Sequence, residues 1–347
     1  MSEGLPQVSL IILCRNEETF IRRCLDSVIA NEYPKDKLEV LVVDGMSSDK
    51  TREIIREYEH RYSYIRMINN YKKFIPFAYN EGIKHSSGEL VMIMSAHAFY
   101  ADDYIRKCVE ASLKYDVDNV VGSWRILPRR KSLMAKALVT VLSSPFGVGN
   151  ARYRTRSNAK KNVEYVDTGA YGCYKRNVFE KIGLYNENLI RGEDMEFNLR
   201  LKRAGGKTLL IPDAVVFYFA RTGLKSFCRH NFKNGLWALL PFKYASGVPV
   251  SWRHLVPLFF VGSLIILMVL SLFSNIYFWF FLSIVVLYLL LGISFSLKTA
   301  IQEKQWKDVF ILPVAFGTLH ISYGLGSLVG LLNVIFSTRF WEKRRVR

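Results

Sequence analysis

The chain has few cysteines, and none of them stands in a spacing typical of a metal site. Its 347 residues contain five cysteines, an odd number, without a single C-x-x-C pair. The sequence therefore supports neither a disulfide framework nor a structural zinc site, and a reducing compartment is the simpler environment. The five are scattered along the chain: Cys14, Cys24, Cys108, Cys173 and Cys228.

Two signatures are also missing from the N-terminal part. Residues 1–7 have neither a basic region nor a long apolar run, so we expect no cleavable signal peptide. No G-x-G-x-x-G follows the first predicted strand, residues 8–13, which disfavours a dinucleotide-dependent oxidoreductase. We therefore expect any attachment to a membrane to come from the C-terminal part.

Acidic residues are scarce relative to basic ones. Lys and Arg number 48 against 30 Asp and Glu, which gives a formal charge of +18. This charge raises the possibility of a nucleic-acid binder, but no recognised nucleic-acid motif accompanies it. Half of the residues are hydrophobic, which excludes intrinsic disorder. The charge is also unevenly distributed, because residues 255–347 hold only 8 Lys/Arg and 3 Asp/Glu.

Three C-terminal segments lack charge altogether. They cover residues 255–273, 276–297 and 309–336, with 19, 22 and 28 residues. At a rise of about 1.5 Å per residue, each is long enough to cross a hydrocarbon core of roughly 30 Å. Their lack of Asp, Glu, Lys and Arg argues against a transporter with a cytosolic sensor domain. With the N-terminal domain in the cytosol, three crossings would place the basic tail, residues 339–347, outside the cell. Because basic residues flanking membrane segments are usually cytosolic, we favour a broken or re-entrant third segment.

Strand-like and helix-like segments alternate regularly in the first third of the chain. This alternation is typical of βαβ units and predicts a parallel sheet. The predicted strands are residues 8–13, 39–44, 64–68 and 89–94, and the predicted helices end at residue 29 or cover 51–58, 76–84 and 101–114. Ligands of such sheets bind beyond the carboxyl ends of the strands. The segments of interest are therefore residues 14–18, 44–49 and 95–100.

Three motifs in this region resemble those of one enzyme family. Residues 8–18 read Val-Ser-Leu-Ile-Ile-Leu-Cys-Arg-Asn-Glu-Glu, residues 42–51 read Val-Val-Asp-Gly-Met-Ser-Ser-Asp-Lys-Thr, and residues 76–83 read Pro-Phe-Ala-Tyr-Asn-Glu-Gly-Ile. Over residues 8–240 the chain resembles the inverting A-type glycosyltransferases of family 2. The resemblance implies an α/β fold in which a nucleotide-sugar-binding, Rossmann-like domain of the glycosyltransferase A-type is followed by C-terminal hydrophobic membrane helices.

The composition and the resemblance together predict three regions. We expect a catalytic domain over residues 1–225, an interfacial amphipathic connector over residues 226–254, and a membrane region over residues 255–347. Residues 125–161 show no clear pattern and are interpreted as a loop or lid, with a basic patch at residues 152–161.

The resemblance also implies a set of donor-binding residues. Asp44 ends the second predicted strand, where it would accept hydrogen bonds from a base or ribose, and an Asx-turn or helix cap is the alternative role. The full set is Cys14, Arg15, Asn16, Glu17, Asp44, Ser47, Asn80, Ser95, Ala96 and His97.

The metal-binding motif of the family is changed in this chain. Residues 95–98 read Ser-Ala-His-Ala where the family has Asp-x-Asp, and this resembles the succinoglycan-type glucosyltransferase branch, which has Asp-Ala-His-Ala. The family implies Mg²⁺ or Mn²⁺, which prefers hard oxygen ligands and bridges the donor diphosphate. Ser95 carries no negative charge and His97 is a weak candidate ligand, so the sequence weakens the expectation of metal dependence.

The predicted catalytic pair is Glu193 and Asp194, in the segment Arg-Gly-Glu-Asp-Met-Glu-Phe over residues 191–197. By resemblance, Asp194 is the general base that deprotonates an acceptor hydroxyl, and Glu193 orients it. The alternative is an acidic pair that only complements the dipole of the helix expected over residues 194–204.

The sequence indicates the acceptor-binding residues less clearly than the donor-binding residues. The resemblance places a wall of the acceptor site at Asp167 and Gly169, although an ordinary tight turn is also compatible with these residues. Residues 227–237 stand where processive polysaccharide synthases carry Gln-x-x-Arg-Trp, which is absent. A diphosphate-binding and interfacial role is one interpretation of this segment, and a solvated basic helix face is the other. The residues concerned are Arg229, His230, Lys233 and Trp237.

The sequence thus predicts a membrane-attached inverting glycosyltransferase. It would move one sugar from a nucleotide-sugar donor, with UDP favoured, to a polyprenyl-diphosphate-linked or growing glycan acceptor in polysaccharide or glycoconjugate biosynthesis. We expect a multi-pass protein of the cell membrane with a cytoplasmic catalytic domain, whose basic residues contact anionic lipids. A catalytically weak or inactive nucleotide- or glycan-binding membrane protein is the alternative, because the Asp-x-Asp motif is lost.

Overall fold

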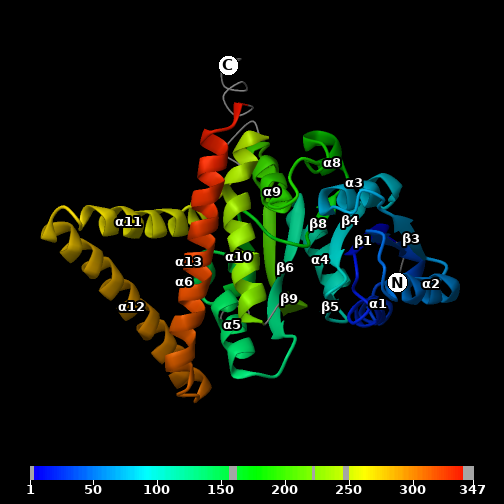
Figure 1. Cartoon of the computed structure of the whole chain (residues 1–347). Coiled ribbons are helices and arrows are strands. Elements are labelled where there is room, and N and C mark those ends of the chain that lie inside the picture. The colour runs from blue at the N-terminus through cyan, green and yellow to red at the C-terminus, as the bar shows by residue number, and fades with distance from the viewer. Residues whose placement is uncertain (1–3, 156–161, 221–222, 245–249, 339–347) are drawn as a thin grey trace. The chain divides into compact units, whose positions relative to one another are not determined.

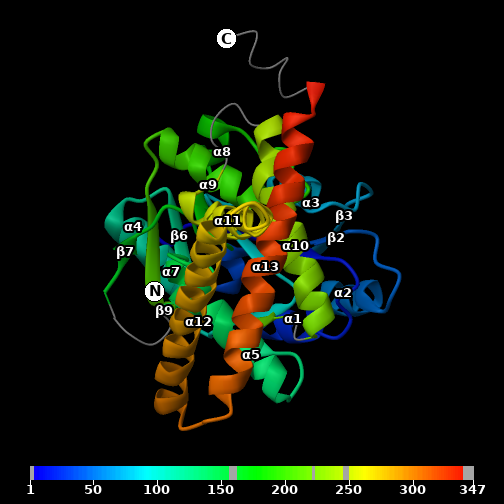
Figure 2. The ribbon, with the colours of Figure 1, turned by 60° about the vertical axis from the view of Figure 1, so that its left-hand side comes forward.

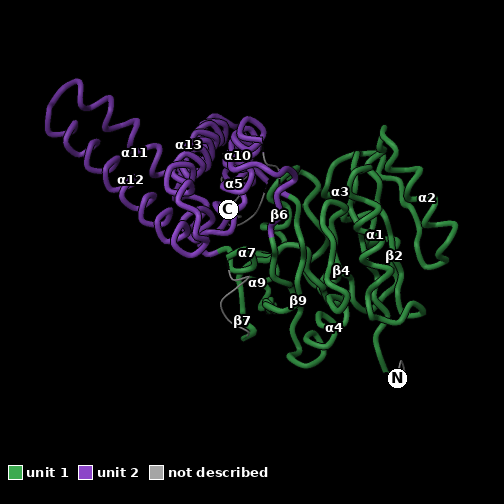
Figure 3. Tube along the Cα trace, turned by 90° about the horizontal axis from the view of Figure 1, so that it is seen from below, with its two compact units in different colours: residues 1–125, 151–219 green, residues 126–150, 220–347 purple. Residues whose placement is uncertain are grey.

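A computed structural model describes residues 4–155, 162–220, 223–244 and 250–338 (Figure 1). Two compact units make up the chain (Figure 3). The first comprises residues 1–125 and 151–219, and the second comprises residues 126–150 and 220–347. The second half of the predicted basic patch, residues 156–161, and the basic tail, residues 339–347, lie outside the described residues.

The first unit is built on a mixed sheet of nine strands in the described part of the chain, in the order β3-β2-β1-β4-β8-β6-β9-β5, with β7 paired to β9. Strands β3, β2, β1 and β4 are parallel, as predicted, whereas β8 pairs antiparallel with both β4 and β6. The strands are β1 (Val8–Cys14), β2 (Leu38–Asp44), β3 (Ile65–Asn69), β4 (Leu90–Ser95), β5 (Ala98–Tyr100), β6 (Asn119–Pro128), β7 (Glu164–Tyr165), β8 (Cys173–Lys175) and β9 (Thr208–Ala220).

Helices cover the sheet of the first unit. Strand β1 is central and almost wholly apolar and buried, as expected for a parallel strand that is covered on both faces. The helices are α1 (Ile21–Ile29), α2 (Thr51–Arg61), α3 (Ile75–His85), α4 (Tyr104–Tyr115), α7 (Arg152–Thr155), α8 (Asn177–Ile182) and α9 (Glu193–Arg203). One core cluster joins the sheet to α3, α8 and α9 and includes Ile11, Val43, Ala78, Tyr79, Ile93, Phe179 and Phe197.

The second unit is helical apart from the strand ends that enter it. Two of its helices fall within residues 125–161, where the sequence suggested a loop, because an apolar stretch there packs against the later helices of the same unit. Its helices are α5 (Leu133–Ser143), α6 (Pro145–Val148), α10 (Leu224–Leu239), α11 (Val256–Leu270), α12 (Asn275–Glu303) and α13 (Asp308–Ile335), with 3₁₀ turns at Leu240–Lys243 and Trp252–His254; the turn Lys35–Lys37 belongs to the first unit.

Within the described residues, three helical stretches are long and apolar enough to cross a membrane, with mean hydropathies of 2.1, 2.5 and 1.5: Trp252–Leu270, Asn275–Glu303 and Asp308–Ile335. The last is one continuous helix, α13, without the break that we favoured from its glycines and Pro313.

The glycines of α13 have a packing role instead. Helices α10 and α13 run side by side (Figures 1 and 2). A Cβ atom on Gly326 would lie 2.0 Å from the Phe232 carbonyl oxygen, and one on Gly235 would lie 1.9 Å from the Tyr323 carbonyl oxygen. The glycines therefore let two helix backbones approach closely, which is how small residues are used between apolar helices.

Candidate active site

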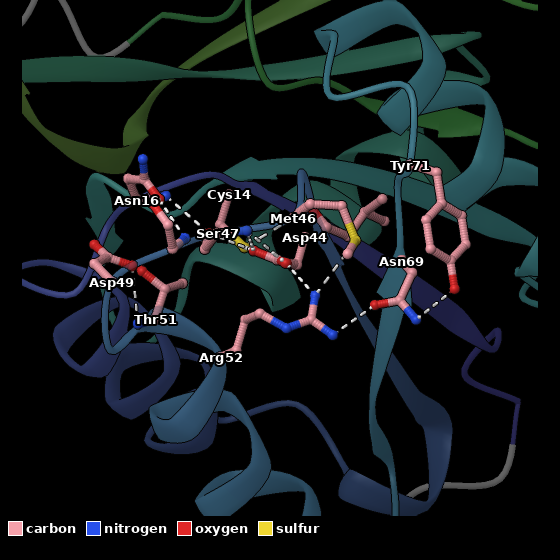
Figure 4. Close-up of polar contacts among 12 residues, drawn as sticks. Cys14, Asn16, Asp44, Met46, Ser47, Asp49, Thr51, Arg52, Asn69 and Tyr71 are labelled. Atoms are coloured by element: carbon pink, nitrogen blue, oxygen red, sulfur yellow. Dashed lines mark hydrogen bonds and ion pairs between the residues drawn. The ribbon is translucent and has the colours of Figure 1, made fainter.

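The loops that follow β1 and β2 are hydrogen-bonded to each other (Figure 4). The backbone N–H of Asn16 donates to Ser47 Oγ at 2.8 Å, and the N–H of Ser48 donates to Asn16 Oδ1 at 2.9 Å. The N–H of Glu17 donates to Thr51 Oγ1 at 2.8 Å. These bonds place the predicted donor residues Asn16, Glu17 and Ser47 together at the carboxyl edge of the parallel strands.

Left-handed backbone occurs in both of these loops. Asn16 has a φ of 54° and Met46 a φ of 57°, and Met46 is a residue type that rarely adopts this conformation. Such strained residues persist only where the surrounding structure holds them, and they concentrate at functional sites. The predicted neighbours Cys14 and Arg15 lie in the same region. The Cys14 thiol is buried, which raises its pKa well above the usual range, with Asp44 adding to the effect, and Arg15 Nη1 donates to the Lys73 carbonyl at 3.5 Å.

The Asp44 carboxylate is buried and bonded to other side chains and backbone groups of the protein. Its carboxylate accepts hydrogen bonds from the N–H and the hydroxyl of Ser47, at 3.0 and 2.5 Å, and forms an ion pair with Arg52 at 2.5 Å. Arg52 continues to Asn69 Oδ1 at 2.9 Å, and Asn69 Nδ2 reaches Tyr71 Oη at 3.4 Å (Figure 4). The turn role that we gave as the alternative for Asp44 is therefore present, and Arg52 is a polar residue that the sequence reasoning missed.

Ser95 is the last residue of β4, and Ala96 and His97 follow it directly. His97 Nδ1 lies 3.1 Å from Glu17 Oε1 and 3.1 Å from Ser95 Oγ, while the Ala96 N–H donates to the Leu13 carbonyl at 3.2 Å. The structure thus brings together the first and the third of the predicted donor segments.

The residues at this position do not form a divalent-metal site on their own. No group of three His, Cys, Asp or Glu side chains that could hold a metal ion occurs among the described residues. Ser95 offers a neutral hydroxyl, and one imidazole nitrogen of His97 is occupied by Glu17 and Ser95. A Mg²⁺ or Mn²⁺ ion in proteins prefers anionic oxygen ligands, so the donor set at residues 95–97 fits such an ion poorly.

The predicted catalytic pair begins helix α9. Gly192, with a φ of 74°, caps the helix, and Glu193 and Asp194 occupy its first turn. Glu193 is buried, and burial raises its pKa well above the usual range, with the Asp194 charge raising it further. Asp194 is partly exposed. Of the two adjacent carboxyl groups, Glu193 is therefore the one whose protonated form is favoured, and Asp194 is the more exposed.

Asn198, on the next turn of α9, ties this pair to the segment before β8. Its Nδ2 donates to the carbonyl of Asp194 at 2.7 Å and to the carbonyl of Gly169 at 3.1 Å. A Cβ atom on Gly169 would lie 2.5 Å from the Val121 side chain, so the glycine permits close packing against β6. The other predicted acceptor residue, Asp167, forms an exposed ion pair with Lys202 at 2.5 Å.

Tyr171 interacts with two of the predicted site residues, Ser95 and Asp194, although the sequence reasoning did not single it out. It has a φ of 59°. Burial raises the pKa of its phenol well above the usual range; Tyr218 and Asp194 add to this increase, whereas a hydrogen bond with Ser95 and the charge of Arg154 oppose it. Tyr171 therefore connects the donor segment at Ser95 with the candidate base Asp194.

Four rings pack around this position, and we call them the aromatic cluster: Trp124, Tyr153, Tyr171 and Tyr218. Trp124 stacks on Tyr171 and Tyr218, with ring centroids 5.0 and 4.6 Å apart, and meets Tyr153 edge-on at 5.1 Å. Tyr218 in turn contacts the ring of His97 at 5.1 Å. The cluster therefore lies next to the segment that follows β4.

Some predicted residues have other environments. Asn80 is buried, and its amide makes hydrogen bonds to the backbone of Tyr185 and to Glu187 at 2.9–3.0 Å, which gives it a structural role. The residues predicted from the missing Gln-x-x-Arg-Trp motif lie on α10, in the second unit, with Arg229 and Lys233 exposed and the other two partly buried: Arg229, His230, Lys233 and Trp237.

The sequence matches one family profile. The profile described as "Glycosyl transferase family 2" covers residues 9–183, about half of the chain. A relative from Methanococcus voltae, named dolichyl N-acetyl-alpha-D-glucosaminyl phosphate 3-beta-D-2,3-diacetamido-2,3-dideoxy-beta-D-glucuronosyltransferase, is 30% identical over 234 residues, which cover 66% of this chain and 71% of the relative. The succinoglycan biosynthesis protein ExoA of Rhizobium meliloti (strain 1021) is 25% identical over 253 residues, which cover 68% of this chain and 74% of the relative.

A solved structure shares the fold. The mannosyltransferase PcManGT from Pyrobaculum calidifontis, in complex with GDP-Man and Mn²⁺, has a TM-score of 0.59 at 18% sequence identity, over 94% of this chain and 88% of that chain. At this identity the likeness concerns the fold alone. The mixed sheet described above is accordingly that of a glycosyltransferase A-type domain, with three long apolar helices in the C-terminal part.

Proposed function

The chain belongs to glycosyl transferase family 2, and from this premise we propose that it transfers one sugar, with inversion, from a nucleotide-sugar donor to a lipid-linked or growing glycan acceptor. The observation that carries the proposal is the position of the acidic pair. Glu193 and Asp194 begin α9, and Asp194 interacts with Tyr171, which is also hydrogen-bonded to Ser95 at the end of β4.

In the proposed reaction, Asp194 takes the proton of an acceptor hydroxyl. The hydroxyl oxygen then attacks the anomeric carbon of the donor sugar, and the bond between that carbon and the diphosphate breaks, with the electron pair leaving on the nucleoside diphosphate. A single displacement of this kind inverts the anomeric centre. Glu193, with its raised pKa, remains protonated beside the base and leaves Asp194 as the acceptor of the proton.

The donor is proposed to lie along the carboxyl edge of the parallel strands, where open α/β sheets bind their ligands. The supporting geometry is the joining of the loops after β1 and β2 and the contact between Glu17 and His97. A UDP-sugar remains our preferred donor. The solved mannosyltransferase with this fold holds GDP-Man, so GDP-sugars belong in any test.

The acceptor is proposed to be lipid-linked. The name of one relative supports this choice, a glucuronosyltransferase named for a dolichyl phosphate sugar, and the succinoglycan biosynthesis protein supports a role in making a glycan. The three apolar helical stretches are consistent with a multi-pass protein of the cell membrane. We propose that its catalytic unit is cytoplasmic, and that the exposed cations Arg229 and Lys233 contact anionic lipid headgroups.

A divalent ion is part of the family expectation, and PcManGT was solved with Mn²⁺. In this chain the poor ligand set at residues 95–97 leads us to propose that Mg²⁺ or Mn²⁺ contributes little. A bound divalent ion, where the family has one, offsets the charge of the leaving diphosphate.

The test is sugar transfer by the full chain purified in detergent. The protein is incubated with UDP-glucose, UDP-galactose or GDP-mannose and with a polyprenyl-diphosphate-sugar extract, with and without Mn²⁺, and the lipid products are separated. We expect transfer from one donor, and a loss of about 10²- to 10⁴-fold in Asp194→Asn, the range usual for removal of a general base. The matched control is Glu180→Gln, an exposed carboxylate on α8.

Two outcomes would contradict the proposal. Equal rates of sugar transfer by Asp194→Asn and the wild type would show that Asp194 is not the general base. Nucleotide binding without transfer to any acceptor would favour the alternative, a nucleotide- or glycan-binding membrane protein without turnover.

A further inference from the structure

Arg154 lies on the aromatic cluster of the first unit. Its guanidinium carbon is 5.0 Å from the centroid of the Trp124 ring and 5.4 Å from that of Tyr153. The neighbouring side-chain oxygens are the phenols of Tyr153, Tyr171 and Tyr218, of which Tyr153 is hydrogen-bonded to Arg154. A cation stacked on aromatic rings and surrounded by neutral hydroxyl groups keeps its full charge available for an anion.

The polar groups of this cluster are incompletely paired. Among the described residues, Arg154 forms no ion pair, and its Nε is buried without a hydrogen-bond partner. The Arg154 guanidinium lies over the Trp124 ring, and the indole Nε1 of Trp124 is likewise buried without a hydrogen-bond partner. Buried donors without acceptors are rare in native proteins and require an explanation, such as a ligand. Two donors without partners thus occur in one cluster, one of them on a cation, and an anionic acceptor could satisfy both.

Arg152, on the same helix α7, has a different environment. Its Nε pairs with Glu164 Oε1 at 3.2 Å. The two arginines, two positions apart, thus differ in their partners. Arg152 pairs with a carboxylate, whereas Arg154 has only aromatic rings and phenols around it. This difference makes Arg152 a matched control for any test of Arg154.

The cluster also adjoins the position where the donor phosphates are proposed to lie. Tyr171 interacts with Arg154, Ser95 and Asp194. Tyr218 interacts with Arg154 and contacts His97 at 5.1 Å. Arg154 is therefore linked through Tyr171 and Tyr218 to the segment that carries Ser-Ala-His in place of the Asp-x-Asp of the family, at which a nucleoside diphosphate would need positive charge.

We infer that Arg154, together with the indole N–H of Trp124, binds the diphosphate of the nucleotide-sugar donor and offsets the charge of the leaving nucleoside diphosphate in place of a carboxylate-bound metal ion. This inference rests on the proposed function. Guanidinium groups bind phosphate through paired, charge-assisted hydrogen bonds, and these bonds strengthen as charge develops on the leaving group. The arrangement explains how a family 2 enzyme can lack both metal-binding carboxylates.

The experiment measures binding of the nucleoside diphosphate, which is independent of the acceptor and of turnover. UDP and GDP are titrated by calorimetry into the full chain in detergent, in EDTA and then with Mn²⁺. We expect the wild type to bind one of them in EDTA, and Arg154→Gln to bind it about 10- to 100-fold more weakly, as for the loss of hydrogen bonds to a charged group. Arg154→Lys keeps the charge but not the planar fork, so an intermediate affinity is expected, and Arg152→Gln should match the wild type.

Several results would overturn the inference. Arg154→Gln or Arg154→Lys with wild-type affinity in EDTA would do so, as would a wild type that binds nucleotide only after Mn²⁺ is added. Unchanged nucleotide affinity with a raised KM for the acceptor lipid would assign the cation to the acceptor's phosphate instead of the donor's. If the wild type binds neither nucleotide under either condition, the proposed function fails together with the inference.

Discussion

Arg52 closes the Asp44 carboxylate off from solvent. The Arg52 Nη1 lies 2.5 Å from Asp44 Oδ2, and the side chains are 19% and 0% exposed, respectively. With Ser47 on the other side, the carboxylate has no free face. A nucleotide base could use Asp44 only by displacing Arg52 or Ser47, whereas Arg15, Asn16 and Ser48 in the loops at this edge are exposed.

Removal of the Arg52 charge should destabilise the first unit. Arg52→Gln leaves a buried carboxylate without its cation, and breaking a buried ion pair in this way costs about 3 kcal/mol. The free energy of unfolding, or the shift in Tm of the full chain in detergent, measures the effect. Arg56→Gln, an exposed arginine on the same helix α2, should change stability by less than about 0.5 kcal/mol. Equal stabilities of the two variants would show that the Asp44–Arg52 pair contributes nothing.

The stability of the protein should depend on pH through Glu193. Because the pKa of Glu193 is raised on folding, the folded state holds a proton that the unfolded state has released at any pH between the ordinary value of 4.5 and the raised one. Stability is then fully present below pH 4.5 and falls as pH rises, by about 1.4 kcal/mol per pH unit within that window.

Glu193→Gln removes this titration while keeping a buried polar side chain of similar size. The variant should gain stability over the wild type as pH rises from 5 to 8, and the two should converge near pH 4.5. Thermal unfolding in a pH series measures the difference, in which the contributions of all other titrating groups cancel. Parallel curves for the two proteins would mean that Glu193 ionises normally.

A carboxylate at position 95 should create metal dependence. Ser95→Asp would add an anionic ligand beside His97 and Glu17, which lie 3.1 Å apart, and so bring two carboxylates and an imidazole together, a set that can hold Mn²⁺. We expect Mn²⁺ to strengthen nucleotide binding in this variant and to have little effect on the wild type. Calorimetric titration with UDP or GDP, in Mn²⁺ and in EDTA, measures the change. An identical Mn²⁺ response in both proteins would show that position 95 does not face the phosphates.

The first half of the fold could be predicted because its signals are local. Buried apolar runs followed by polar loops and amphipathic helices located β1 to β4 and α1 to α4 within a few residues. Strands β5 and β6 were not predicted, since one has only three residues and the other continues beyond the clear apolar pattern at Val121. The antiparallel direction of β8 depends on its partners across the sheet, which no short stretch of sequence reveals.

The candidate site was predicted in part for the same reason. Glu193 and Asp194 stand out because an acidic pair at a helix start is visible in the sequence. The amide of Asn80, in contrast, bonds to residues more than 100 positions away, and Arg154 is set apart only by its aromatic neighbours and missing partner. Such roles are decided by tertiary contacts, and the motif around Asn80 carried no sign of them.

The glycines of α13 are another case that sequence alone could not decide, and they yield a prediction. A glycine in an apolar helix is compatible either with a break or with close packing, and the neighbouring helix decides between them.

Gly326→Ala would drive a Cβ atom to 2.0 Å from the Phe232 carbonyl oxygen of α10, and a backbone atom cannot move aside easily. We therefore expect a loss of about 1–3 kcal/mol. Gly317→Ala, in the same helix but with no atom within 4 Å of the added Cβ, should be neutral or stabilising by up to about 1 kcal/mol. Thermal unfolding of both variants in detergent measures the contrast, and a Gly326→Ala protein as stable as Gly317→Ala would mean that α10 and α13 do not pack closely through this glycine.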